Sequence, residues 1–170
     1  RGVALSSTGR LVYAYQTGGG LESAVYQLGE PATGLHALQK DTTYDLEKGK
    51  FPEVAITPWN NGDAIVAVHE SDRSDGNLWY HVGVRHEGAD YIAWGGSHRY
   101  DAGTQPSVAL NTHGVVVEVH KSPTSEDTLW YHLGSVDING REVLWGDSRQ
   151  YDTGEMPDVA LNDSYKVVEV

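Results

Sequence analysis

Two Trp-Tyr-His triplets are the residues of this sequence best suited to contact a ligand. Trp79 and His81 stand in N-L-W-Y-H-V-G, and Trp130 and His132 stand in T-L-W-Y-H-L-G. Side chains alternate along a β-strand, so each tryptophan shares a face with the histidine two residues later. An indole offers a flat apolar surface to the C–H face of a sugar, and an imidazole hydrogen-bonds to hydroxyl groups. We predict that these four residues bind a hydroxylated ligand, with packing between sheets as the structural alternative.

Five further residues lie near the triplets in the sequence, and four of them form matching pairs. His69 and His120 end a preceding apolar segment, Glu118 shares a face with His120, and Trp94 and Trp145 begin W-G-G-S and W-G-D-S. We include all five as candidate ligand-binding residues, and structural hydrogen bonds or packing are again the alternative. A zinc site built from these His and Glu residues needs a third ligand from elsewhere in the chain. The sequence therefore predicts no metal site and no cofactor.

The acidic residues give no sign of catalysis. Asp101 and Asp152 each follow a tyrosine in Y-D-x-G, where a carboxylate can accept backbone N–H groups and hold a turn. Among 24 Asp and Glu residues, none is set apart as a catalytic pair. A hydrolase has one special site, whereas here the polar residues recur from copy to copy. We expect several equivalent binding pockets and no enzymatic activity.

The copies repeat with a period of about 51 residues. That spacing separates His69 from His120, Trp79 from Trp130, Trp94 from Trp145 and Asp101 from Asp152. Such a period predicts a single domain, 1–170, built of repeated units. We number these units 1 to 4, with the ranges 1–51, 52–105, 106–156 and a partial 157–170.

Unit 1 keeps the apolar framework and loses the polar features. It has Val25 and Gln27 in place of the Trp and His of L-W-Y-H, and Tyr44-Asp45 in place of the later Tyr-Asp pairs. We therefore expect ligand binding to be confined to units 2 and 3 or their borders.

The elements that must position these residues are short strands. In unit 3 we expect four, at Val108–Leu110, Val115–His120, Leu129–Gly134 and Glu142–Trp145. The second is apolar on both sides, which indicates a sheet covered on both faces. The sequence therefore predicts an all-β fold with four antiparallel strands in each blade of a β-propeller, and a β-trefoil is the alternative. Since three and a half units are too few to close a propeller ring, we expect a homo-oligomer or part of a longer chain.

Composition excludes several classes of partner. A formal net charge of −12 disfavours nucleic acid and anionic membrane surfaces, and no apolar run is long enough for a spanning helix, so no membrane insertion is expected. Cysteine is absent, which removes thiolate chemistry and leaves the redox compartment open. The chain begins at Arg1 rather than Met, so we expect an upstream piece. Localisation stays unknown, with secretion slightly favoured.

The repeated sequence resembles the blades of bacterial β-propeller lectins, which are sugar-binding proteins and in several cases fucose-specific. The resemblance rests on P-S-V-A-L-N-T-H-G-V-V-V-E-V followed by L-W-Y-H, and it is strongest at Glu118-Val119, Leu129-Trp130 and His132. It implies pockets between adjacent blades, in which aromatic rings stack on the sugar and polar side chains contact its hydroxyls.

Together these observations predict a multivalent, non-enzymatic, carbohydrate-binding lectin whose partners are glycans or glycoconjugates. A protein-interaction or structural propeller without sugar binding is the alternative.

Overall fold

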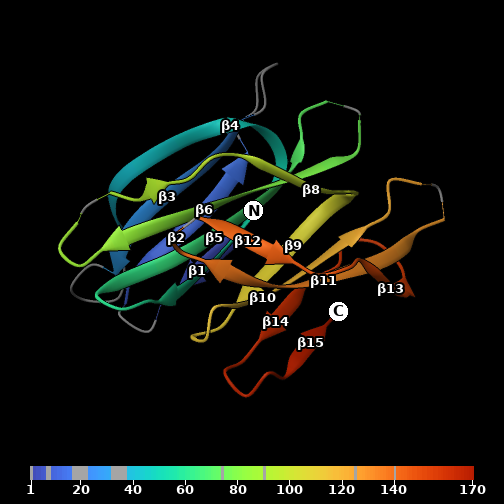
Figure 1. Ribbon diagram of the computed structural model, residues 1–170. Helices are drawn as coiled ribbons and strands as arrows, with labels where there is room; N and C mark the ends of the chain where they lie inside the picture. Colours follow the sequence, from blue (N-terminus) through green and yellow to red (C-terminus); the bar gives the residue numbers. More distant parts are fainter. Residues whose placement is uncertain are drawn as a thin grey trace.

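The structure is a computed structural model that describes residues 2–6, 9–16, 23–31, 38–73, 75–89, 91–124, 126–139 and 141–170, with the main chain alone for 23–31 and 38–46. These residues form fifteen β-strands, and the described part of the chain contains no helix (Figure 1). The predicted all-β class is therefore confirmed. None of the described residues belongs to a helix that could cross a membrane.

The strands are distributed over all four predicted units. Units 1 and 2 comprise β1 (Gly2–Leu5), β2 (Leu11–Gln16), β3 (Ser23–Pro31), β4 (Leu38–Pro58), β5 (Gly62–Ser71), β6 (Asn77–His86), β7 (Ala93–Trp94) and β8 (His98–Ala102). Units 3 and 4 comprise β9 (Thr104–Leu110), β10 (Val115–Lys121), β11 (Thr128–Asp137), β12 (Glu142–Trp145), β13 (Arg149–Thr153), β14 (Val159–Leu161) and β15 (Val167–Glu169).

Neighbouring strands pair antiparallel, and the sheets are open. The long strand β4 pairs with β3 up to Lys48 and with β5 from Gly49, so it is both the last strand of unit 1 and the first strand of unit 2. The last position of unit 3 holds two short strands, because β12 and β13 both pair with β11. The predicted fourth strand, Glu142–Trp145, is therefore only half of that position. The intervening Gly146-Asp147-Ser148 interrupts the pairing.

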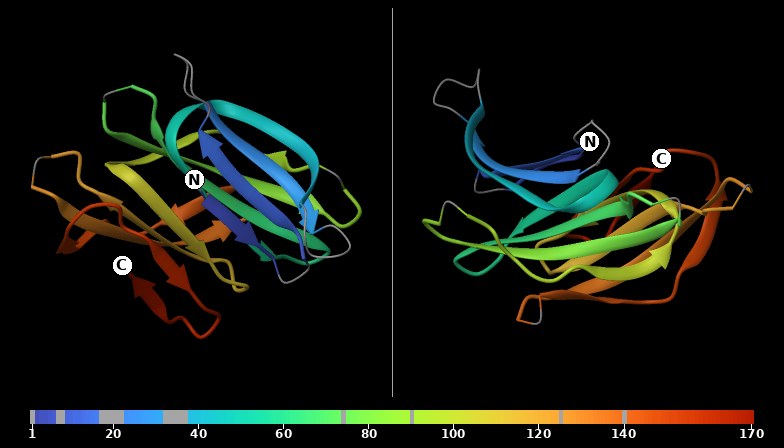
Figure 2. Two further views of the ribbon diagram at one scale, coloured as in Figure 1. Left: turned by 180° about the vertical axis from the view of Figure 1, so that it is seen from behind. Right: turned by 90° about the horizontal axis from the view of Figure 1, so that it is seen from above.

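The core lies between successive sheets, which Figure 2 shows face to face in chain order. Val12 and Ala14 of unit 1 pack against Val54, Ile56, Ile65 and Ala67 of unit 2. A second cluster joins units 2 and 3, and a third joins unit 3 to the β14–β15 hairpin. Residues 63–71 of β5 and 116–120 of β10 are all buried, which confirms that the second strand of these units is covered on both faces.

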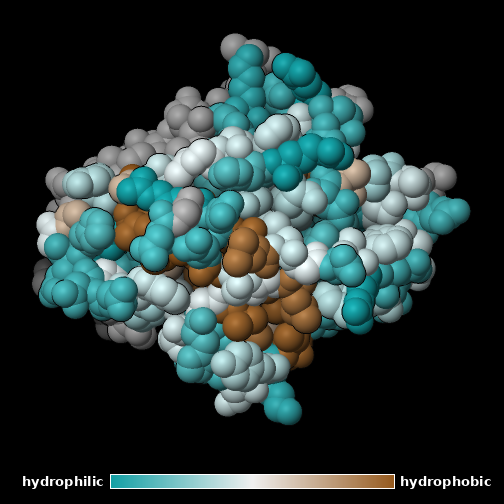
Figure 3. Space-filling view, in the orientation of Figure 1, coloured by the Kyte–Doolittle hydropathy of each residue, from teal (hydrophilic) through white to brown (hydrophobic). Residues whose placement is uncertain are grey.

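Apolar side chains also remain at the surface. Figure 3 shows them gathered in the region of β12 and the β14–β15 hairpin, where Leu133, Leu144, Val167 and Val168 are exposed. At the other end of the stack, Val3 and Leu5 of β1 are exposed as well. The outermost sheets thus carry uncovered apolar side chains.

Candidate functional site

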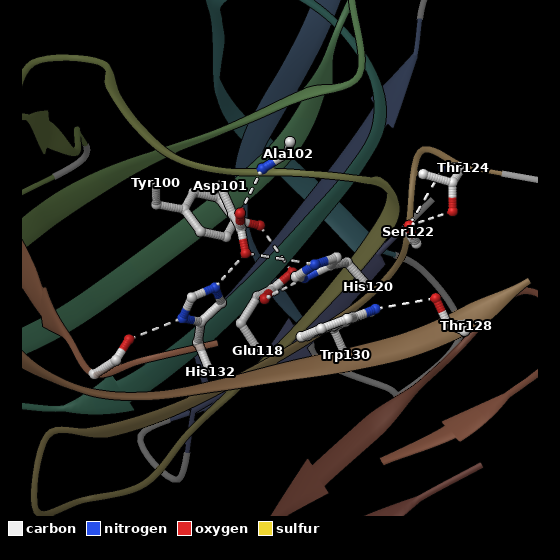
Figure 4. A network of polar contacts seen from close by, with 11 residues as sticks. Tyr100, Asp101, Ala102, Glu118, His120, Ser122, Thr124, Thr128, Trp130 and His132 are labelled. Carbon is white, nitrogen blue, oxygen red and sulfur yellow. Dashed lines mark hydrogen bonds and ion pairs between the residues drawn. The ribbon is translucent and has the colours of Figure 1, made fainter. Parts of the chain in front are cut away.

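One carboxylate and two imidazoles meet where unit 2 ends against unit 3. Asp101 comes from β8, His120 from β10 and His132 from β11, and we call this group the Asp101 cluster (Figure 4). Asp101 Oδ2 lies 2.7 Å from His132 Nε2 and 3.6 Å from His120 Nε2. The two imidazole rings are stacked with centroids 5.8 Å apart. The third polar partner that the sequence analysis lacked is therefore supplied by the preceding unit.

The outer nitrogens of both imidazoles are held by other groups. His132 Nδ1–H donates to the carbonyl oxygen of Gly146 at 3.0 Å, and His120 Nδ1–H donates to Glu118 Oε2 at 3.0 Å. Glu118 is fully buried and also accepts a hydrogen bond of 2.8 Å from the Tyr100 hydroxyl. Because each ring donates outward through Nδ1, its Nε2 atom is directed toward the Asp101 carboxylate.

The electrostatics of the cluster favour an ionised carboxylate. Burial alone would raise the pKa of Asp101, but hydrogen bonds from His132, the Ala102 N–H and Ser148, together with the charge of His120, lower it to about 2. Burial acts to lower the pKa of His132, yet the Asp101 hydrogen bond and nearby carboxylates raise it. Asp101 is thus a hydrogen-bond acceptor over the whole physiological pH range.

A second cluster has the same construction between units 1 and 2. It consists of Glu47 from β4, His69 from β5 and His81 from β6, and we call it the Glu47 cluster. Glu47 Oε1 lies 2.7 Å from His69 Nε2 and 3.5 Å from His81 Nε2, and the rings again stack at 5.8 Å. Burial would raise the pKa of Glu47, but contacts with His69, His81 and Ser97 lower it.

Strand register shows that the two carboxylates occupy corresponding positions. Asp101 lies opposite Leu78 and Glu47 lies opposite Ala24, in each case beside a β-bulge. The sequence comparison had placed Tyr44-Asp45 at the position of the later Tyr-Asp pairs. The register corrects that alignment by two residues, because Asp45 lies opposite Val25.

A glycine two residues after each carboxylate lets the histidine ring approach the main chain. A Cβ on Gly103 would lie 2.5 Å from Cδ2 of His120, and a Cβ on Gly49 would overlap the ring of His69. The glycine of the repeated Y-D-x-G motif therefore serves close packing against the cluster as well as a turn.

Beside the Asp101 cluster lies a pocket of about 220 Å³, which we call the Trp130 pocket. Its wall contains one aromatic side chain and several polar ones: Asp101, Ala102, His120, Ser122, Trp130 and Ser148. Trp130 Nε1–H donates to Thr128 Oγ1 at 3.0 Å, which fixes the orientation of the indole ring (Figure 4). The pocket thus combines a flat apolar surface with hydroxyl and carboxylate groups.

A larger pocket, of about 510 Å³, lies between the first strands of the four units. Its polar side chains are partly engaged with one another, since Ser107 Oγ donates to Asp158 Oδ1 at 2.7 Å. The aromatic side chain in its wall is Phe51. Although this pocket is larger, it lacks the pairing of an oriented indole with polar groups that distinguishes the Trp130 pocket.

The predicted ligand-binding residues differ in exposure and in the contacts that they make. Trp79 and Trp130 are partly exposed, whereas all four histidines and Glu118 are buried. Trp94 and Trp145 are partly buried and pack against the clusters: Trp94 meets the His81 ring edge-on, and Trp145 meets His132 edge-on. Sequence reasoning missed Asp101 and Glu47 as partners of the histidines, and Ser122 and Ser148 as pocket residues. The Y-D-x-G and W-G-x-S motifs were the available signals.

The sequence matches no protein-family model and no curated protein. Its fold is shared with several solved structures. Among them are the NanB sialidase of Streptococcus pneumoniae (TM-score 0.62, 14% identity), a Penicillium chrysogenum alpha-L-arabinanase complexed with arabinobiose (0.57, 13%) and a Trypanosoma rangeli sialidase in complex with the inhibitor DANA (0.53, 11%). The matches cover 98%, 98% and 93% of this chain but only 26%, 55% and 32% of the respective proteins.

This likeness shows a fold of the β-propeller type, and it favours the propeller over the β-trefoil. It also corrects one expectation. We expected no enzymatic activity, but all three matched proteins are glycoside hydrolases. The reasoning failed because framework residues can recur in every unit of a propeller while other side chains differ, so recurrence does not separate binding proteins from hydrolases.

Proposed function

We propose that this protein binds carbohydrate in pockets at the borders between successive units, and that the Trp130 pocket is one of them. The observation that carries the proposal is a fixed indole ring in one small pocket with an ionised carboxylate and two serine hydroxyls. Sugars present an apolar C–H face and a rim of hydroxyls, which require this combination of surfaces. The volume, below the roughly 300–1,000 Å³ of pockets for drug-sized ligands, suits a single sugar residue.

In the bound state each side chain of the pocket would contact the part of the sugar that matches its chemistry. The Trp130 ring stacks on the apolar face of the sugar. Asp101 accepts hydrogen bonds from sugar hydroxyls, since its carboxylate is ionised at neutral pH. Ser122 and Ser148 either donate or accept, because a hydroxyl can do both. His120 lines the pocket, whereas the buried Glu118 and His132 keep the Asp101 and His120 side chains in place.

Corresponding residues recur one unit earlier, and this supports a protein with several binding sites. Glu47, Ser71, Trp79 and Ser97 occupy the places of Asp101, Ser122, Trp130 and Ser148. Several weak sugar sites on one protein could bind one glycan-covered surface together. Once the first site is occupied, the second site meets its sugar at a high effective concentration, so the overall affinity rises. The resemblance to bacterial β-propeller lectins supports the same proposal.

The test combines a glycan array with tryptophan variants. We expect the purified chain to bind a subset of glycans, and Trp130→Phe to weaken the best ligand about tenfold, which corresponds to roughly 1.4 kcal/mol. Trp145→Phe is the matched control, because Trp145 packs against Tyr100 and His132 rather than lining the pocket. It should lower the thermal midpoint with little direct effect on sugar affinity.

Two results would contradict the proposal. One is an array without reproducible glycan binding, which favours a protein-interaction or structural role. The other is a Trp130→Phe variant that loses stability but binds the best glycan as the wild type does, which would place the site elsewhere.

A further inference from the structure

We infer that the Asp101 cluster and the Glu47 cluster each bind a divalent transition-metal ion of the zinc type. The inference goes beyond carbohydrate binding, because it concerns the buried histidines behind the tryptophan surface, although Asp101 and His120 also line the Trp130 pocket. It departs from the sequence analysis, which predicted no metal for want of a third ligand. The preceding unit supplies that ligand in both clusters.

The donor atoms are of the right type and lie close enough together. In each cluster two imidazole nitrogens and one carboxylate oxygen lie within 4.8 Å of one another. Two histidines with one carboxylate form a set that zinc accepts when a fourth position stays open. Bonds of 2.0–2.1 Å in tetrahedral geometry place such ligand atoms about 3.3 Å apart. The distances of 2.7 and 3.6 Å in the Asp101 cluster lie on either side of that value.

The surroundings of the Asp101 cluster match those of metal-binding histidines. Such a histidine usually donates its other N–H to a carboxylate or a backbone carbonyl, which fixes its tautomer and orients the ligating nitrogen. His120 donates to Glu118, and His132 donates to the Gly146 carbonyl. Both Nε2 atoms are directed at the Asp101 carboxylate, and His132 Nε2 shares a hydrogen bond with it at 2.7 Å. A metal ion that replaces this proton can bind both Nε2 atoms and the carboxylate at once, whereas the proton serves one ring only.

The Glu47 cluster adds an independent observation. His81 is 4% exposed, and neither of its ring nitrogens makes a well-aligned hydrogen bond to a described residue, although Nε2 lies 3.5 Å from Glu47 Oε1. Burying polar atoms without good hydrogen bonds is costly, so such a side chain points to a missing ligand. His69 donates through Nδ1 to the Glu70 carbonyl, and its Nε2 approaches Glu47 at 2.7 Å without hydrogen-bond alignment. A metal ion between Glu47, His69 and His81 would bind His69 Nε2, one ring nitrogen of His81 and the Glu47 carboxylate.

The two clusters differ in charge, which predicts their order of affinity. Glu118 adds a second, fully buried carboxylate to the Asp101 cluster. The corresponding position of unit 2 is Ala67, since Ala67 lies opposite His81 as Glu118 lies opposite His132. A divalent cation is therefore neutralised in the Asp101 cluster and only half neutralised in the Glu47 cluster. We expect the Asp101 cluster to bind the metal more tightly.

The experiment is a metal titration of the full chain without sugar. After a chelator has been removed by dialysis, Zn²⁺ is titrated by calorimetry, and Co²⁺ is followed by visible absorption as a probe of coordination. We expect two saturable sites per chain, one after Asp101→Asn and none after Asp101→Asn combined with Glu47→Gln. Glu118→Gln should weaken the tighter site about 10–100-fold. His113→Gln, at an exposed histidine outside both clusters, is the control and should change nothing.

Thermal unfolding with chelator shows that each variant folds, so loss of metal cannot be mistaken for loss of structure. No saturable Zn²⁺ uptake by the wild type would overturn the inference and leave the clusters as protonated ion pairs. Uptake that persists unchanged in the Asp101→Asn/Glu47→Gln variant would overturn it too. Sugar affinity measured with chelator and with Zn²⁺ separates the two proposals, since either can fail while the other stands.

Discussion

Replacement of Glu118 by alanine should reveal how much of the stability of units 2 and 3 depends on the polar contacts behind the Trp130 pocket. Glu118 is fully buried, and it accepts hydrogen bonds from the Tyr100 hydroxyl at 2.8 Å and from His120 Nδ1–H at 3.0 Å. Tyr100 belongs to unit 2 and Glu118 to unit 3, so the first of these bonds joins two units.

The size of the effect follows from the two donors left behind. A buried donor without a partner costs about 1–3 kcal/mol, so Glu118→Ala should lower the free energy of unfolding by about 2–6 kcal/mol. For a chain of this length that corresponds to a fall in thermal midpoint of about 4–24 °C. Tyr100→Leu removes one donor and leaves the carboxylate half satisfied, so it should cost about 1–3 kcal/mol.

The double variant Glu118→Ala/Tyr100→Leu tests the reasoning most sharply. It reproduces the residue types of the preceding border, where Ala67 and Leu46 occupy these positions. Since both partners of one hydrogen bond are then absent, the double variant should cost clearly less than the sum of the single variants. Urea unfolding in the presence of a chelator measures all three. Strict additivity, or a Glu118→Ala cost below about 0.5 kcal/mol, would refute the network as described.

Three further outcomes are expected. Arg85→Met should lower the free energy of unfolding by about 3–5 kcal/mol, because the buried Asp63 carboxylate loses its ion pair of 2.8 Å. The double variant Arg85→Met/Asp63→Leu should regain much of the lost stability, and urea unfolding measures both variants. Gly103→Ala should cost about 1–3 kcal/mol, since its Cβ would press on His120, whereas Gly96→Ala, with no atom closer than 3.6 Å, should be nearly neutral by the same measurement. Because the outermost sheets expose apolar side chains, the isolated chain should associate, and light scattering showing a stable monomer at micromolar concentration would count against this.

Much of the fold could be predicted because strand patterns are local. The apolar segment Val115–His120 predicted a strand buried on both faces, and residues 116–120 are all buried. The division of the fourth strand into β12 and β13 could not be predicted from the sequence, since W-G-D-S is typical of an ordinary turn. Only the pairing of both β12 and β13 with β11 shows that the chain resumes the same sheet after the interruption.

The candidate site was only half visible in the sequence for a physical reason. The two histidines of each cluster lie on paired strands of one unit, so alternation and spacing place them on one face. Their carboxylate comes from the preceding unit across the border, and neither alternation nor spacing within one unit reports that contact. In unit 1 the β-bulge beside Glu47 and the irregular spacing of the strands shifted the apparent alignment onto Asp45.

Because the two clusters lie at the borders between units, a ligand bound at a cluster would contact two units at once. Each cluster takes its carboxylate from one unit and its histidines from the next, so any cation held there also holds two sheets together. A ligand that binds only the docked arrangement stabilises that arrangement by its binding free energy. The Trp130 pocket is built across the same border, with Asp101 and Ala102 from one side and Trp130 from the other. The proposed sugar site, the proposed metal site and the docking of units 2 and 3 therefore share one contact, the approach of Asp101 to His120 and His132.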